Sequence, residues 1–165
     1  MHAARQQRDV LLHPGEYFVG DADCRVSTLL GSCVSITLWH PERLIGAMSH
    51  FLLSTRSVPK VSELDGRYGD EAILLMLKGL VRHGVDPREC VAKLFGGGNM
   101  FPDRKPAHAQ LIGLRNGEAA RCLLQGLEIP LVAESLFGVG HRQIIFDIAT
   151  GRVWSRQHAL PTAPT

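Results

Sequence analysis

The sequence predicts a single domain of the α/β or α+β class. The chain has 165 residues, of which 45% are hydrophobic and 21% charged, and this is typical of one globular domain. Apolar residues alternate with polar ones in the first half, as in β-strands, and two later segments repeat apolar residues at helical spacing. Helices packed on a mixed sheet would bury the apolar faces of both. We expect a folded domain at residues 16–158 between flexible ends at 1–15 and 159–165.

The first half is predicted to consist mainly of strands. Short β segments are expected at residues 16–20 and 25–30. Apolar and polar residues alternate over Cys33–Leu38, which indicates a half-buried strand. A turn at residues 40–43, where Pro41 prevents the ladder from continuing, leads into a further strand over Leu44–Leu53. These two strands form a predicted β-hairpin.

Two helices are predicted in the second half, at Asp70–Arg82 and Asn116–Leu127. The first has acidic residues in its first turn and Gly84 after its end, and the second has Asn116 at its start. The remaining strands are expected at residues 90–95, 131–134, 143–148 and 153–155.

Charge and hydropathy exclude several classes of protein. The 18 Lys and Arg residues nearly balance the 16 Asp and Glu residues and form no basic cluster, so no nucleic-acid partner is expected. The longest apolar run, Ala72–Leu77, is too short to span a membrane. Residues 1–15 lack the apolar stretch of a signal peptide. We therefore expect a cytoplasmic protein without membrane insertion.

Four cysteines occur, and they indicate neither a metal site nor a disulfide framework. None forms a Cys-x-x-Cys pair or has a histidine at zinc-ligand spacing. In a reducing compartment each is either a small buried hydrophobic residue or a reactive thiol. We expect the former for Cys24, Cys90 and Cys122. The run Gly96–Asn99 lacks the context of a phosphate-binding loop and predicts a tight turn instead, so no cofactor is expected.

Cys33 differs from the other cysteines in its neighbours. It follows Gly31 and Ser32, where a sharp turn could leave backbone N–H groups free to form an oxyanion hole. A free thiol has a pKa of about 8.5 and needs a base to act as a nucleophile at neutral pH. The predicted hairpin returns His50 to the neighbourhood of Cys33, as in Cys–His covalent catalysis. The alternative is a buried, inert Cys33 beside a hydrogen-bonded core His50.

Several blocks of sequence resemble the CheD family of chemoreceptor glutamine deamidases. The signature blocks are residues 28–38 (TLLGSCVSITL) and 46–53 (GAMSHFLL). Further blocks follow in the same order, so the resemblance covers residues 16–155. They lie at residues 67–70, 93–101, 112–116, 129–134, 144–147 and 150–153.

The resemblance implies a three-layer α/β/α sandwich and a Cys–His–Thr site that needs no metal or cofactor. In such a site a cysteine attacks the side-chain amide of a receptor glutamine, and the thioester is hydrolysed to glutamate. Cys33 and His50 match the nucleophile and the base. A gap-free match puts the third hydroxyl at Ser27, with Thr28 one residue later as the alternative. A one-residue shift on a strand turns a side chain to the opposite face.

The resemblance also implies partners and a substrate-side loop. Chemoreceptor cytoplasmic domains are the expected substrate, and a CheC-type phosphatase is a further expected partner. Gly97, Gly98 and Asn99 are expected on the substrate side of the site. The chain departs from the family pattern over Phe137–Arg142, where Val139 replaces an asparagine. Two alternatives remain: a docking protein with little catalysis, and a thiol hydrolase with another substrate. The presence of both Cys33 and His50 favours catalysis.

Overall fold

The computed structural model describes residues 6–58, 63–103 and 108–158. Nine strands, two α-helices and one 3₁₀-helix occur within these ranges. In chain order they are β1 (Arg8–Leu11), β2 (Tyr17–Gly20), β3 (Cys24–Leu30), β4 (Val34–His40), β5 (Ile45–Ser49), α1 (Gly69–Arg82), η1 (Pro87–Glu89), β6 (Val91–Gly96), α2 (His108–Gly126), β7 (Leu131–Leu136), β8 (His141–Asp147) and β9 (Val153–His158).

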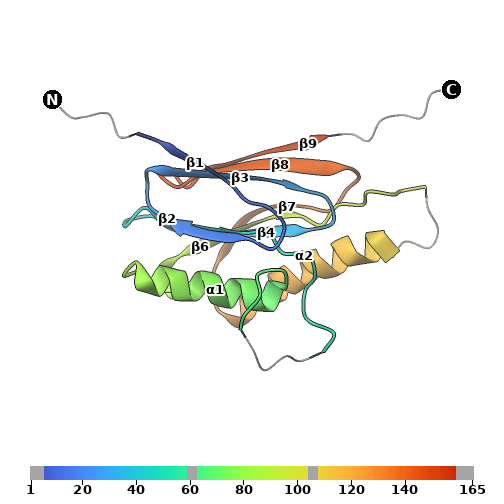
Figure 1. Cartoon of the computed structure of the whole chain (residues 1–165), viewed down its shortest axis with the longest axis horizontal. Helices are drawn as coiled ribbons and strands as arrows, with labels where there is room; N and C mark the ends of the chain where they lie inside the picture. Colours follow the sequence, from blue (N-terminus) through green and yellow to red (C-terminus); the bar gives the residue numbers. More distant parts are fainter. Residues whose placement is uncertain (1–5, 59–62, 104–107, 159–165) are drawn as a thin grey trace.

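The strands form two mixed sheets that lie face to face (Figure 1). The five-stranded sheet has the order β2-β5-β4-β6-β7, with only β6 and β7 parallel. The four-stranded sheet has the order β1-β3-β8-β9, with only β1 and β3 parallel. Sequential strands β3 and β4 belong to different sheets, so the turn between them crosses from one layer to the next.

Both helices cover the same face of the five-stranded sheet, and the four-stranded sheet covers the other (Figure 1). One hydrophobic core, with Ile36 and Met76, lies between the helices and the sheet. A second core, with Val26 and Met48, lies between the two sheets. The predicted α/β class, with helices packed on a mixed sheet in one domain, is confirmed. The layer order differs from helix–sheet–helix, because in the described residues the third layer is a sheet.

The predicted hairpin is confirmed. β4 and β5 are antiparallel, with Leu38 opposite Ala47. The regular part of the second strand ends at Ser49, earlier than expected, but an isolated bridge pairs Val34 with Phe51. Both pairs have the same register, so the pairing continues past His50 without a bulge.

Two segments differ from expectation. Helix α2 begins at His108, well before Asn116, which lies in its middle and is 1% exposed. The apolar pattern missed the first turns because Gly113 and Asn116 face the interior. Strand β1 pairs with β3 inside the N-terminal segment that we expected to be flexible. The tail at 159–165 lies outside the described residues. No helix within the described ranges is long and apolar enough to cross a membrane.

Candidate active site

Cys33 lies in the crossover between the two sheets, directly before β4. Its side chain packs against the core between the sheets, together with Trp39 of β4. The next residue, Val34, faces the helices. This alternation follows from the two-residue period of a strand. The nucleophile candidate therefore projects into the layer between the sheets and is partly accessible.

His50 follows the last residue of β5 and projects into the same layer. Val34 pairs with Phe51 and Thr37 with Met48, so His50 lies opposite Ser35. Cys33 is two residues from Ser35 on the same face of its strand. Such diagonal neighbours lie roughly 7–8 Å apart, within reach of aromatic and other long side chains. The register thus brings Cys33 and His50 to neighbouring positions on one face of the sheet.

Thr28 of β3 reaches His50 from the opposite sheet. The distance between Thr28 Oγ1 and His50 Nδ1 is 2.7 Å, and the Thr28 hydroxyl donates to the Leu12 carbonyl at 2.8 Å. A hydroxyl has one proton to donate. Because that proton goes to Leu12, the contact with His50 requires Nδ1–H of the ring to donate to Thr28. His50 is therefore held in the tautomer whose Nε2 has a free lone pair, the form that can accept a proton.

Ser27 lies on the other face of β3. Cys24, Val26, Thr28 and Leu30 alternate as buried residues toward the second sheet, whereas Ser27 is only partly buried. The structure thus brings Thr28 to His50 and turns Ser27 away from it. The gap-free match had favoured Ser27, but the strand period gives the inward position to Thr28.

Burial sets the protonation of the site at rest. It lowers the pKa of His50 from 6.5 to about 4, an effect that the Glu16 carboxylate partly opposes. Burial also raises the pKa of the Cys33 thiol, while a hydrogen bond from its own backbone N–H acts in the opposite direction. At neutral pH the pair is therefore a neutral thiol and a neutral imidazole, so His50 must take up the proton as the sulfur attacks.

The glycine-rich loop after β6 contacts the turn that carries Cys33. Gly97 N–H donates to the Cys33 carbonyl, and Gly98 N–H donates to the Gly31 carbonyl, each at 2.9 Å. Gly97 has a φ of 65°, in the left-handed region that favours glycine. Within the described ranges, the backbone N–H groups of Ser32 and Cys33 donate to no other residue. They are the available donors for an oxyanion.

The same loop pairs with the segment that departs from the expected family pattern. Asn99 exchanges backbone hydrogen bonds with Gly138 and Gly140, and its bridge partner is Val139. A cavity of about 160 Å³ lies here, bordered by Gly97, Asn99, Leu114 and residues 137–139. The predicted substrate-side residues and the divergent loop therefore form one surface beside the site.

Arg142 donates hydrogen bonds to the backbone of the segments that form this surface. It is 3% exposed, and its guanidinium donates to the carbonyls of Gly96, Ser135 and Phe137. Burial lowers its pKa. One buried cation thereby joins the ends of β6 and β7, where the glycine-rich loop begins.

Two residues of α2 that contact the site were not among the site residues predicted from the sequence. Gly113 faces the glycine-rich loop, and a Cβ there would lie 2.6 Å from the Gly97 carbonyl oxygen. One turn later, Asn116 donates from Nδ2 to the carbonyls of Ser32 at 3.1 Å and Leu52 at 2.8 Å. A glycine and an asparagine three positions apart on one helix face were the available signal, since such residues in a helix usually have a packing or functional reason.

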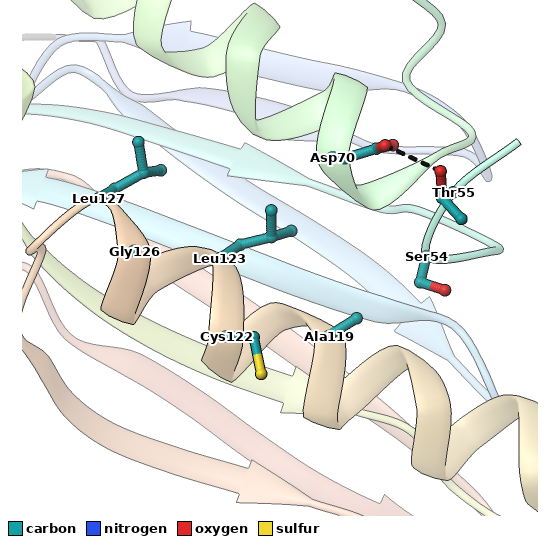
Figure 2. Close-up of a pocket in the computed structure, with 8 residues that line it drawn as sticks. All are labelled: Ser54, Thr55, Asp70, Ala119, Cys122, Leu123, Gly126 and Leu127. Carbon is teal, nitrogen blue, oxygen red and sulfur yellow. Dashed lines mark hydrogen bonds between the residues drawn. The ribbon is translucent and has the colours of Figure 1, made fainter. Parts of the chain in front are cut away.

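A larger groove of about 540 Å³ lies between α1 and α2, on the helix side of the five-stranded sheet (Figure 2). It is mostly apolar, and Thr55 donates to Asp70 at its rim. It contains no histidine and lies on the far side of the sheet from the Cys33 side chain. Its lining is Ser54, Thr55, Asp70, Ala119, Cys122, Leu123, Gly126 and Leu127.

In the part of the chain that the structure describes, neither the other cysteines nor the His, Asp and Glu residues indicate a second catalytic site or a metal site. Cys24 and Cys90 are buried as expected, and burial raises the pKa of both thiols, that of Cys90 to about 11. The expectation for Cys122 was wrong, because it is exposed on α2. Among the residues that the structure describes, no cluster of three or more His, Cys, Asp or Glu side chains could hold a metal ion.

Comparison with known proteins gives one consistent family. Residues 52–157 match the sequence profile of the family described as "CheD chemotactic sensory transduction". A relative from Albidiferax ferrireducens, named "Probable chemoreceptor glutamine deamidase CheD 2", is 56% identical over 158 residues, which cover 95% of this chain and 91% of the relative. Relatives with the same name, numbered 3 and 1, come from Dechloromonas aromatica and Chromobacterium violaceum. They are 46% and 44% identical over 92% and 90% of this chain, and over 89% and 77% of their own lengths.

Proposed function

Because this chain belongs to the CheD family, we propose that it is a chemoreceptor glutamine deamidase with Cys33 as nucleophile and His50 as general base. One observation carries the mechanism: the hydrogen bond between His50 Nδ1 and Thr28 Oγ1, which leaves Nε2 of the ring as the proton acceptor. A histidine that merely filled space in the core would not need a defined tautomer beside a cysteine.

In the first half of the reaction, His50 Nε2 takes the Cys33 proton while the sulfur attacks the carboxamide carbon of the substrate glutamine. The carbonyl oxygen becomes an oxyanion, which the N–H groups of Ser32 and Cys33 can stabilise. The imidazolium then gives its proton to the amide nitrogen, the C–N bond breaks, and ammonia leaves. The low pKa of His50, about 4, makes this imidazolium a ready proton donor.

In the second half, the thioester is hydrolysed. Water gives a proton to the neutral His50 and attacks the thioester carbon, and the C–S bond breaks. The sulfur recovers its proton from His50, and the product is a glutamate side chain. Thr28 accepts a hydrogen bond from the ring throughout, so it orients the base without exchanging a proton.

The surroundings of the site support further parts of the proposal. Gly97, Gly98 and Asn99, together with Val139, are the proposed contacts for the substrate backbone on either side of the glutamine. A free thiol nucleophile needs reducing conditions, so we propose that the enzyme works in the cytoplasm. The family relationship makes a CheC-type phosphatase a proposed partner.

The test is deamidation of a receptor cytoplasmic fragment by wild-type protein, Cys33→Ala and His50→Gln, with conversion of glutamine to glutamate followed by mass spectrometry. We expect conversion by wild type and none by either variant. Cys122→Ser is the matched control, since Cys122 is an exposed thiol remote from the site and its removal should leave the rate unchanged. Conversion that survives Cys33→Ala would refute the mechanism.

The same experiment separates the alternatives. A wild-type protein that converts no glutamine but binds a CheC-type phosphatase would be a docking protein. One that converts no glutamine but hydrolyses an activated ester through Cys33 would be a thiol hydrolase with another substrate.

A further inference from the structure

The turn that carries Cys33 is held by three hydrogen bonds to consecutive carbonyls. The Gly31 carbonyl accepts from Gly98 N–H, the Ser32 carbonyl from Asn116 Nδ2, and the Cys33 carbonyl from Gly97 N–H. Two of the three donors are backbone groups of the glycine-rich loop. The central one is a side chain that is 1% exposed, from a helix on the other side of the sheet.

A trans peptide group is planar, so its N–H points away from its C=O. Because Asn116 fixes the direction of the Ser32 carbonyl, it also fixes the direction of the Cys33 N–H, which points away from α2. The Cys33 side chain packs in the layer between the two sheets, which also lies away from α2, so the N–H and the sulfur face the same side. This is the side on which an oxyanion would develop when the sulfur attacks a carbonyl.

Asn116 also contacts the chain next to the base. The second proton of Nδ2 goes to the carbonyl of Leu52, two residues after His50, at 2.8 Å. Both contacts are to carbonyl oxygens, so the amide orientation is defined: only the NH₂ end can satisfy them. One amide group thereby joins the chain immediately before Cys33 to the chain just after His50.

We propose that Asn116 is a positioning residue of the deamidase site, which aims the Cys33 N–H at the oxyanion and keeps the nucleophile turn in register with the strand that carries His50. The proposal rests on the proposed function. Asn116 touches neither substrate nor the reacting atoms and acts through the Ser32–Cys33 peptide group.

The test compares Asn116→Leu, which has a similar shape and no donor, with wild-type protein on the receptor fragment. An oxyanion-hole donor is worth roughly 10²–10³-fold in kcat, so misdirecting one should lower kcat by at least about 10-fold. KM should change by less than about 3-fold, since no substrate contact is removed. Asn116→Ala serves as a second variant if leucine does not fit.

The rate at which iodoacetamide alkylates Cys33 distinguishes a positioning role from a merely structural one. A structural defect would lower the alkylation rate and kcat together. This displacement forms no oxyanion, so its rate should stay within about 3-fold of wild type while kcat falls. Leu124→Ala is the matched control: Leu124 is 1% exposed on the same helix but lies in the core beneath α2. It should lower the melting temperature and leave kcat unchanged.

The failure of this inference is distinguishable from failure of the proposed function. Normal kcat in a folded Asn116 variant, with Cys33→Ala inactive, would overturn the positioning role alone. Equal losses of kcat and alkylation rate, or variants that do not fold, would show that Asn116 is only structural. Deamidation that survives Cys33→Ala would instead overturn the mechanism on which the inference rests.

Discussion

The Thr28→Val substitution isolates the contact that gives His50 its tautomer. Valine has nearly the shape of threonine but neither donates to the Leu12 carbonyl nor accepts from His50 Nδ1, so the variant leaves two buried polar groups without partners. Each such group costs about 1–3 kcal/mol, so the free energy of unfolding should fall by about 2–6 kcal/mol.

The effect on activity follows from the same contact. Without Thr28 as acceptor, the ring is free to rotate or to change tautomer. Loss of the hydrogen bond that orients a metal-bound histidine costs about 10–100-fold in activity, and we take the same range for this base. We expect kcat for deamidation of the receptor fragment to fall by that factor, measured at a temperature where circular dichroism shows the variant folded. Thr28→Ser keeps the hydroxyl and should recover most of the rate.

Ser27→Ala is the matched control, because the hydroxyl of Ser27 lies on the opposite face of the same strand. Its kcat should stay within about 2-fold of wild type. A Thr28→Val variant with wild-type kcat, or a Ser27→Ala variant with a large loss, would refute the assignment of the hydroxyl.

Three other features yield predictions. The folded-state pKa of His50, about 4 against an ordinary 6.5, means that the unfolded chain binds this proton first as the pH falls. The contribution of His50 to the free energy of unfolding should therefore be unchanged above pH 6.5 and should fall by up to about 3 kcal/mol toward pH 4. Urea titrations in which His50→Gln shows the same pH dependence as wild type would contradict this. Arg142→Met removes the three hydrogen bonds from the buried guanidinium to the carbonyls of Gly96, Ser135 and Phe137, and should destabilise the fold by at least about 3 kcal/mol in the same titration, whereas Arg152→Met, an exposed control, should be neutral. Gly113→Ala places a Cβ 2.6 Å from a backbone oxygen and should cost about 1–3 kcal/mol and most of the activity, while Gly126→Ala on the same helix meets no atom within 4 Å and should be tolerated.

Local pattern was sufficient for the part of the site that lies on one hairpin. The alternation from Cys33 onward gave the strand, the turn at Pro41 gave the return, and the register that follows brings His50 to the diagonal position. Each step depends on residues close in the sequence, where period and turn chemistry determine the outcome.

The choice between Ser27 and Thr28 depended on the face of a strand rather than on the spacing of a motif. Counting back from Cys33 crosses the turn at Gly31, where spacing says nothing about face. The apolar residues of β3 indicate the buried face. Cys24, Val26 and Leu30 occupy every second position, and Thr28 shares their face. Strand period was the better guide here.

The remaining contacts join segments distant in sequence, and no local pattern indicates them. β3 pairs with β8 across more than half of the chain, and Asn116 reaches Ser32 and Leu52 from a helix whose first turns are not amphipathic. Tertiary packing decided these elements against their local propensities. The layer order followed from the same long-range pairing.

The atom that fixes the direction of the Thr28 proton is a main-chain carbonyl at residue 12. Every amino acid offers that carbonyl, so aligned sequences would not reveal its role. The Leu12 side chain, 4% exposed, matters only by keeping the segment after β1 docked, together with the bond from Leu12 N–H to the Ser27 carbonyl. A bulky fusion, an antibody or a proteolytic cut that separated this segment from β3 would remove the Leu12 acceptor. The Thr28 hydroxyl would then be free to donate to the His50 ring. The ring proton of His50 would then lie on Nε2 instead of Nδ1, and Nε2 could no longer accept a proton, although every catalytic side chain would be intact.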